Sequence, residues 1–204
     1  MTSTNESVRF YLAAKDYLRQ AGFQAEIDWQ LARELHAFTE SDLLREAAWV
    51  TLCAGFSEAV VRRRFDFISL CFCDWESAEA ICSRAERCKA TSLTRFGNRQ
   101  KIEAIISTAK FLDRTGFAEF KRLVLADPIN ALQSLPFIGP VTAFHLAKNL
   151  GFPTAKPDRH LQRLARIMGY SNAHQLCGAL ASATGDPVQL IDIVLWRFAE
   201  RHLA

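Results

Sequence analysis

The sequence lacks an apolar run long enough to cross a membrane. Spanning a bilayer takes roughly 18–20 consecutive residues without charge, and no apolar stretch of this chain reaches that length. The first seven residues are polar and contain neither the basic segment nor the apolar segment of a secretory leader. We therefore expect a cytoplasmic protein with no membrane partner.

The six cysteines do not form a metal-binding pattern. None of their spacings gives CxxC, and no His-x-x-x-His pair complements them, so we expect no metal site. Free thiols, mostly buried in a reducing compartment, are the simpler interpretation. The cysteines are Cys53, Cys71, Cys73, Cys82, Cys88 and Cys177.

The composition is that of an ordinary globular protein. Half of the 204 residues are hydrophobic and 23% are charged, which allows a sizeable core. The net charge of +3 is uneven, because residues 1–50 carry −3 and residues 51–204 carry +6. A basic excess in the second part fits a polyanionic partner, although many proteins without such a partner have one too.

Hydrophobic residues recur every three to four positions over most of the chain, which predicts helices. No segment has the two-residue alternation of a strand, so the predicted fold class is all-α. Ser41 and Ser57 are candidate N-caps. The expected helices span residues 8–20, 26–38, 42–52, 57–72, 77–85, 98–114, 117–125, 128–135, 141–150 and 159–168.

Residues 128–150 have the pattern of a helix-hairpin-helix. Pro136 and Gly139-Pro140 break an amphipathic run tightly, and Pro140 suits the first turn of a new helix. The start of a helix exposes backbone N–H groups, and its dipole favours an anion such as a phosphate. The N–H groups expected to bind it are those of Gly139, Val141 and Thr142.

The hairpin LPFIGPVTA (135–143), followed by KPDRHLQR (156–163), resembles the helix-hairpin-helix DNA glycosylases. The hairpin of that superfamily usually reads LPGVGxxTA, and its aspartate stands in a VDTHVxRV-like string. The spacing from Gly139 to Asp158 is similar as well. The resemblance implies a two-lobed, all-α enzyme that flips a nucleotide out of duplex DNA and removes its base.

Further segments resemble two branches of this superfamily, the bacterial 3-methyladenine glycosylase I branch and the endonuclease III branch. The zinc-binding Cys and His residues of the first branch have no match, and its pocket glutamate falls near Val50. Only Cys177 follows Asp158, so the iron–sulfur cluster of some members is not expected. The resembling segments are AGFS (54–57), VRRR (61–64), CF (71–72) and RQKIEAII (99–106).

Asp158 has a structural and a catalytic interpretation. It precedes the expected helix 159–168 and can cap it by accepting backbone N–H bonds. The resemblance instead places its carboxylate beside the anomeric carbon of the flipped nucleotide. Cleavage there passes through an oxocarbenium-like state, which a fixed negative charge stabilises. The two roles are compatible, because the N–H bonds of a cap favour the ionised carboxylate.

Val141 decides the predicted reaction subtype. Family members that also cut the strand carry a lysine at this hairpin position, and valine cannot act as a nucleophile. The resemblance therefore implies a monofunctional glycosylase that uses water and leaves an abasic site. Lys148 and Lys156 lie elsewhere in the sequence, and a lysine that reaches in from another helix is the alternative.

The DNA contacts are expected at the hairpin and at nearby basic residues. The run from Arg62 to Arg64 is interpreted as a solvated helix face, whereas Arg99 and Lys101 are phosphate candidates. His160 matches a histidine common in the family string. The expected DNA-binding residues are Phe137, Ile138, Gly139, Pro140, Val141, Thr142, Arg99, Lys101 and His160.

A flipped base needs a pocket that sandwiches it, normally between aromatic faces. An electron-poor alkylated purine needs mainly stacking, whereas a modified base with a stable glycosidic bond needs polar contacts or protonation. For each aromatic candidate taken alone, a position in the core is the favoured interpretation. The candidates are Trp29, Trp49, Phe56, Phe96 and Trp196.

We therefore expect a monomeric DNA glycosylase specific for an alkylated or otherwise modified base in double-stranded DNA. One lobe would span residues 40–150, and residues 1–39 and 151–204 would form the other, with Asp158 at the lip of a cleft between them. No cofactor is required, although family hairpins often hold a monovalent cation. The alternatives are a glycosylase for an oxidised, mispaired or hypermodified base, a non-catalytic DNA-binding module, and an all-α protein-interaction domain.

Overall fold

The computed structural model describes residues 2–202, and over that range the chain is helical and contains no β-strand. The all-α prediction is therefore confirmed. The chain divides into two compact units. The first unit comprises Met1–Leu35 and Gly151–Ala204, and the second unit comprises His36–Leu150.

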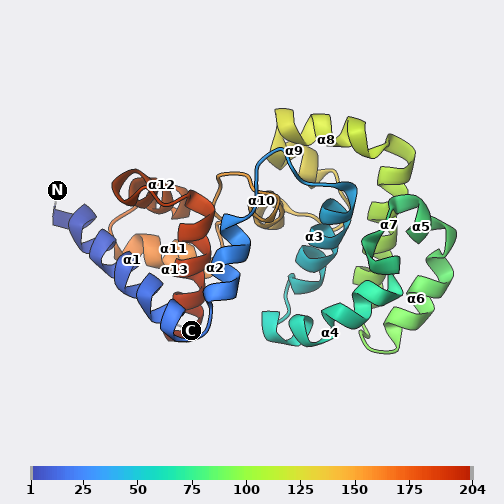
Figure 1. The fold of residues 1–204 in the computed structure, drawn as a ribbon, viewed down its shortest axis with the longest axis horizontal. Helices are drawn as coiled ribbons and strands as arrows, with labels where there is room; N and C mark the ends of the chain where they lie inside the picture. Colours follow the sequence, from blue (N-terminus) through green and yellow to red (C-terminus); the bar gives the residue numbers. More distant parts are fainter. Residues whose placement is uncertain (1, 203–204) are drawn as a thin grey trace. The chain divides into compact units, whose positions relative to one another are not determined.

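In the first unit, α13 packs against each of the other helices (Figure 1). Apolar side chains from all of them share one core, in which Tyr11, Leu161 and Leu195 are fully buried. The helices of this unit are α1 (Thr2–Gln20), α2 (Gln24–Leu31), α11 (Arg159–Ile167), α12 (Ala173–Thr184) and α13 (Val188–His202).

In the second unit, α3 and α7 pack against each other, and each of them buries six apolar residues. The high apolar content of residues 42–52, which predicts a central helix, agrees with this position. The elements are α3 (Glu40–Cys53), α4 (Glu58–Cys71), the 3₁₀ helix η1 (Cys73–Trp75), α5 (Ala78–Ser83), α6 (Ala85–Leu93), α7 (Arg99–Thr115), α8 (Phe117–Ala126), α9 (Pro128–Gln133) and α10 (Pro140–Asn149).

The helix predicted over residues 26–38 is too long, because α2 ends at Leu31. Phe38, the last apolar residue of the pattern, belongs to the second unit. Phe38 is buried there, with its ring edge-on to Phe117 at 6.2 Å and its carbonyl accepting a bond from Lys121 Nζ at 2.8 Å. The periodicity of residues 26–38 thus combines two separate packing surfaces.

The start of α3 also differs from the prediction. Thr39 caps this helix instead of Ser41: the Thr39 hydroxyl accepts the Asp42 N–H at 3.1 Å, and the Asp42 carboxylate accepts the Thr39 N–H at 2.9 Å. This reciprocal pair satisfies two N–H groups that have no partner within the helix. Ser57 does occupy the N-cap position of α4, but its side chain makes no capping bond.

All six cysteines are free thiols, as predicted. Cys88 and Cys177 are buried, and the other four are half-buried. Burial raises the pKa of Cys88 to about 11, so this thiol stays protonated at neutral pH. Within residues 2–202, no group of three or more His, Cys, Asp and Glu side chains is arranged to hold a metal ion.

Gly151 joins α10 to the segment that leads to Asp158, and it has a backbone conformation that other residues avoid. Its φ is +92°, and a Cβ atom built on it would lie 3.0 Å from the carbonyl carbon of Glu34 and 3.1 Å from its oxygen. Both neighbouring atoms are backbone atoms of the same unit, so they cannot move aside as a flexible side chain would.

We expect Gly151→Ala to lower the free energy of unfolding by about 2 kcal/mol or more, since backbone strain and a steric clash add up. Gly185→Ala is the matched control, because Gly185 has a φ of +76° with no atom within 4 Å of the added Cβ. It should cost only the conformational strain. Urea unfolding of the two variants measures the difference, and equal losses would show that the contact with Glu34 costs nothing.

Candidate functional site

The hairpin connects α9 to α10 through residues 134–139. Its side chains divide into an inner and an outer set. Ile138 is buried in the core of the second unit, whereas Phe137 and Val141 are 47% and 41% exposed. Pro140 opens α10, as predicted. The predicted helix-hairpin-helix is therefore present. Its Phe137 and Val141 side chains are exposed and can contact a ligand.

The predicted anion site at this hairpin needs one correction. The N–H of Gly139 is not free, because it donates to the Thr142 hydroxyl at 2.7 Å, and that hydroxyl donates to the Gly139 carbonyl at 3.0 Å. This cap fixes the turn. The N–H groups of Val141 and Thr142 remain in the first turn of α10, where a helix offers no internal acceptor.

Phe137 has an unusual backbone conformation at the tip of the hairpin. Its φ is +69°, a left-handed value that bulky residues rarely adopt. The matching position in the LPGVG pattern is a glycine, which adopts this conformation without strain. The tight turn is thus retained here with a half-exposed aromatic ring at the position where the pattern has no side chain.

Asp158 is the N-cap of α11, so the structural interpretation of this residue is confirmed. Its Oδ1 atom accepts the N–H groups of His160 at 3.0 Å and Leu161 at 3.1 Å. These bonds fix the carboxylate at the start of α11, beside the positive end of the helix dipole. The side chain is 12% exposed, so one face of a mostly enclosed anion is open.

Lys156 lies beside this carboxylate, and the sequence analysis does not predict this ion pair. Its Nζ atom is 3.6 Å from Asp158 Oδ2, so the two oxygens of Asp158 have different partners. The signal was available in the sequence, since Lys156 precedes Asp158 by only two residues. Two side chains that are two positions apart do not in general meet. Here the turn at Pro157 brings the Lys156 and Asp158 side chains together.

The other predicted phosphate contacts lie in different surroundings. Arg99 is the first residue of α7 and its side chain is 66% exposed, with Glu103 Oε1 3.8 Å away. His160 is half-buried in the first turn of α11, and its Nε2 atom accepts a bond from Arg159 Nε at 3.3 Å. Arg99 belongs to the second unit and His160 to the first unit.

The position of Lys101 contradicts its prediction as a DNA contact. The residue is 3% exposed, and its ammonium group donates to the carbonyls of Thr51, Leu52 and Ala54 at 2.5–3.0 Å. Burial lowers the pKa of Lys101. All three ammonium protons are used at the C-terminal end of α3, where a helix leaves carbonyls without internal donors. Lys101 is a structural cap.

The aromatic candidates belong to both units, Trp29 and Trp196 to the first and Trp49, Phe56 and Phe96 to the second. Phe56 and Phe96 pair at 5.4 Å, and Phe56 is 42% exposed whereas Phe96 is buried. The remaining candidates are half-buried and contact other groups: Trp49 lies edge-on to Phe65 at 4.9 Å, Trp29 lies 4.5 Å from the Arg33 guanidinium, and Trp196 lies 4.7 Å from that of Arg197.

Phe56 also shares a neighbour with the hairpin. The Lys101 ammonium lies 5.1 Å from the Phe56 ring centroid and 5.4 Å from that of Phe137. The two half-exposed rings therefore flank the same buried cation. Both distances are within the range of a cation–π contact, which holds aromatic faces in place.

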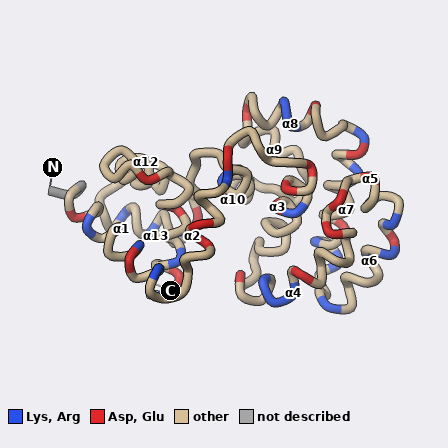
Figure 2. Tube along the Cα trace, viewed as in Figure 1, with Lys and Arg blue, Asp and Glu red and all other residues tan. Residues whose placement is uncertain are grey.

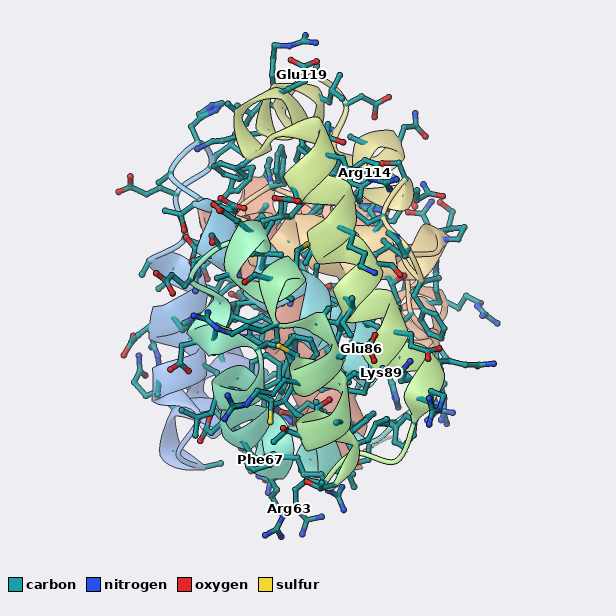
Figure 3. The ribbon with its side chains drawn as sticks, turned by 90° about the vertical axis from the view of Figure 1, so that its right-hand side faces the viewer. Arg63, Phe67, Glu86, Lys89, Arg114 and Glu119 are labelled. Carbon is teal, nitrogen blue, oxygen red and sulfur yellow. The ribbon has the colours of Figure 1, made fainter. Side chains whose placement is uncertain are left out.

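Lys and Arg are interspersed with Asp and Glu along α4 and α6 (Figure 2). All three arginines from Arg62 to Arg64 are exposed, which confirms the solvated helix face, and Arg63 projects outward in Figure 3. Lys89 on α6 is instead paired with Glu103 at 2.5 Å. The charges of this unit are thus partly neutralised by neighbours.

The comparison with solved structures identifies the fold. Protein-family models give no match to the sequence, and neither do curated proteins. Among solved structures, the crystal structure of the 8-oxoguanine DNA glycosylase of Thermotoga maritima is similar, with a TM-score of 0.63 and 20% identity over 95% of each chain. The chain therefore has an all-α DNA glycosylase fold, as the hairpin and Asp158 motifs predict. No helix in residues 2–202 is long and apolar enough to span a membrane.

Proposed function

We propose that this protein is a monofunctional DNA glycosylase that hydrolyses the N-glycosidic bond of a modified base flipped out of duplex DNA. The observation that carries the proposal is the Asp158 carboxylate, which is held by two N–H bonds at the start of α11 and remains partly open. The glycosylase fold and the hairpin support it. A fixed negative charge beside C1′ stabilises an oxocarbenium-like transition state.

Water is the proposed nucleophile for base release. The hairpin position that carries a lysine in strand-cutting relatives is Val141, whose side chain has no nucleophilic atom. The Asp158 carboxylate can orient a water molecule toward C1′ and stabilise the positive charge that develops on the sugar as the base leaves. As the water adds to C1′, one of its protons passes to the carboxylate, and the base leaves with the electron pair of the glycosidic bond. The products would be a free base and an intact strand with an abasic site.

The proposed substrate is an alkylated purine, whose glycosidic bond is already weak and needs little help with the leaving group. The partly exposed Phe56, paired with Phe96, can supply stacking. An oxidised purine is the second candidate, because the similar solved structure is an 8-oxoguanine DNA glycosylase. The family resemblance also allows a mispaired or hypermodified base as the substrate. It further suggests that the hairpin binds a monovalent cation.

The proposal is tested with three duplexes: one treated with a methylating agent, one with a single 8-oxoguanine, and one unmodified. We expect free base from at least one modified duplex, none from the unmodified one, and strand breaks only after alkali. Breaks before alkali would contradict the use of water alone. Salt-dependent DNA binding without release of any base, in a screen extended to mispaired and hypermodified bases, would indicate a non-catalytic binding module.

A further inference from the structure

Asp192 is a buried carboxylate in α13 that no step of the proposed reaction uses. It is 2% exposed, and its Oδ2 atom accepts the backbone N–H of Lys156 at 2.7 Å. Burying a carboxylate is costly unless its hydrogen-bonding capacity is used. One of its oxygens is directed at the segment that leads to Asp158, and the charge of the carboxylate also acts on His174 of α12.

A short series of hydrogen bonds connects Asp192 to the candidate catalytic residue. The carbonyl of Lys156 accepts the N–H of Asp158 at 2.8 Å, and Pro157 between them restricts the backbone further. The Asp158 carbonyl then accepts the N–H of Gln162 at 2.9 Å, within the first turn of α11. Asp158 is therefore held by its N–H, its carbonyl and its side chain.

The helices at the two ends of this series are in contact. α11 packs against α13 within the first unit, and both are labelled in Figure 1. The Asp192 carboxylate fixes the Lys156 peptide to α13, and the Asp158 cap fixes the end of the segment to α11. Rotation of either peptide would move the Asp158 carboxylate and the Lys156 ammonium beside it.

We propose that Asp192 is a positioning residue, which holds Asp158 at the place where its charge acts on the sugar. This inference rests on the proposed function. Electrostatic stabilisation depends on a group that is already in place when charge develops, so a displacement of about 1 Å can cost about 100-fold in rate. Asp192 itself touches neither DNA nor water in this role.

The first test is single-turnover base release by Asp192→Ala and Asp192→Asn. We expect the alanine variant to release base about 100-fold more slowly, with affinity for an abasic-analogue duplex within about threefold of wild type. The asparagine variant keeps an acceptor oxygen and should recover most of the rate. If the alanine variant does not fold, Asp192→Ser replaces it, because a hydroxyl is too short to reach the Lys156 N–H.

Asp186→Ala is the matched control. Asp186 is a carboxylate of the same unit that accepts the Tyr11 hydroxyl at 2.7 Å and the Lys15 ammonium at 2.5 Å, and it has no part in the Asp158 segment. Its loss should destabilise the unit and leave base release below the melting temperature within about threefold of wild type. If Asp186→Ala slows release as much as Asp192→Ala, Asp192 stabilises the unit and positions nothing.

A double variant separates action through Asp158 from independent action. In an Asp158→Asn background, Asp192→Ala should slow the residual base release by less than about threefold, because the charge that it positions is gone. A further loss as large as in the wild-type background overturns the proposal.

Hydrogen exchange tests the same inference without DNA. We expect Asp192→Ala to speed amide exchange at Asp158, His160 and Leu161 at least 10-fold, and Asp186→Ala to leave it within about twofold of wild type. Unchanged exchange in Asp192→Ala contradicts the positioning role. If wild type releases no base at all, the proposed function fails, and exchange still decides whether Asp192 holds Asp158.

Discussion

Asp158→Asn should release modified bases at least about 100-fold more slowly than wild type, with little change in stability. Asparagine and aspartate are equally good N-caps, so the amide oxygen can still accept the N–H groups of His160 and Leu161. The substitution removes the negative charge and keeps the cap. It therefore separates the two interpretations of Asp158, because a residue that only caps α11 would tolerate asparagine in every respect.

The measurement is single-turnover base release on the duplex that wild type processes, together with thermal unfolding. Asp158→Ala is the companion variant, which loses both the charge and the cap and should also be destabilised by about 1 kcal/mol. DNA affinity of Asp158→Asn should be equal to or higher than that of wild type, since a carboxylate repels phosphate. Full activity in Asp158→Asn would remove the catalytic assignment.

Much of the fold follows from local patterns in the sequence. The apolar periodicity predicts α3, α7 and α11 closely, because each of these helices buries one continuous face. Pro140 and the glycine before it predict the start of α10 from backbone geometry alone. In each case the residues that determine the helix bounds lie within or next to the helix, so the bounds can be predicted without tertiary contacts.

The errors arise where the chain changes packing partner. The helix predicted over 26–38 ends at Leu31, because Phe38 packs in the second unit. Residues 85–93 form α6, although the pattern predicts no helix between residues 85 and 98. Of this helix only Cys88 and Ser92 are buried, so its sequence has little apolar periodicity. The sequence analysis gives no bounds for any helix after residue 168, and so it does not define α12 or α13. At α12 the local signals are present, since the Asn172 side chain caps its start and Gly185, with a φ of +76°, ends it.

The sequence predicts those parts of the candidate site that depend on residues close to one another in the chain. Asp158 caps the helix that begins at the next residue, so sequence reasoning finds it. The bond from Asp192 to Lys156 spans 36 positions, and no spacing rule indicates it. The environment of Lys101 is equally remote, since its acceptors lie 47–50 positions away.

Lys101→Met should lower the free energy of unfolding by about 3 kcal/mol or more, because three backbone carbonyls lose their donor. Methionine has nearly the same length and no N–H group. The carbonyls of Thr51, Leu52 and Ala54 would remain largely buried at the end of α3. Lys110→Met is the control on the same helix, where the side chain is exposed and the change should stay within about 0.5 kcal/mol.

Urea unfolding measures the loss of stability, and a salt titration of DNA binding tests the origin of the effect. A lysine that contacts a phosphate contributes about one unit to the slope of log affinity against log salt. Because the Lys101 ammonium is buried on carbonyls, the folded fraction of Lys101→Met should keep the wild-type slope. An unchanged stability with a slope reduced by about one would instead place this ammonium on DNA, and would show that the end of α3 rearranges when DNA binds.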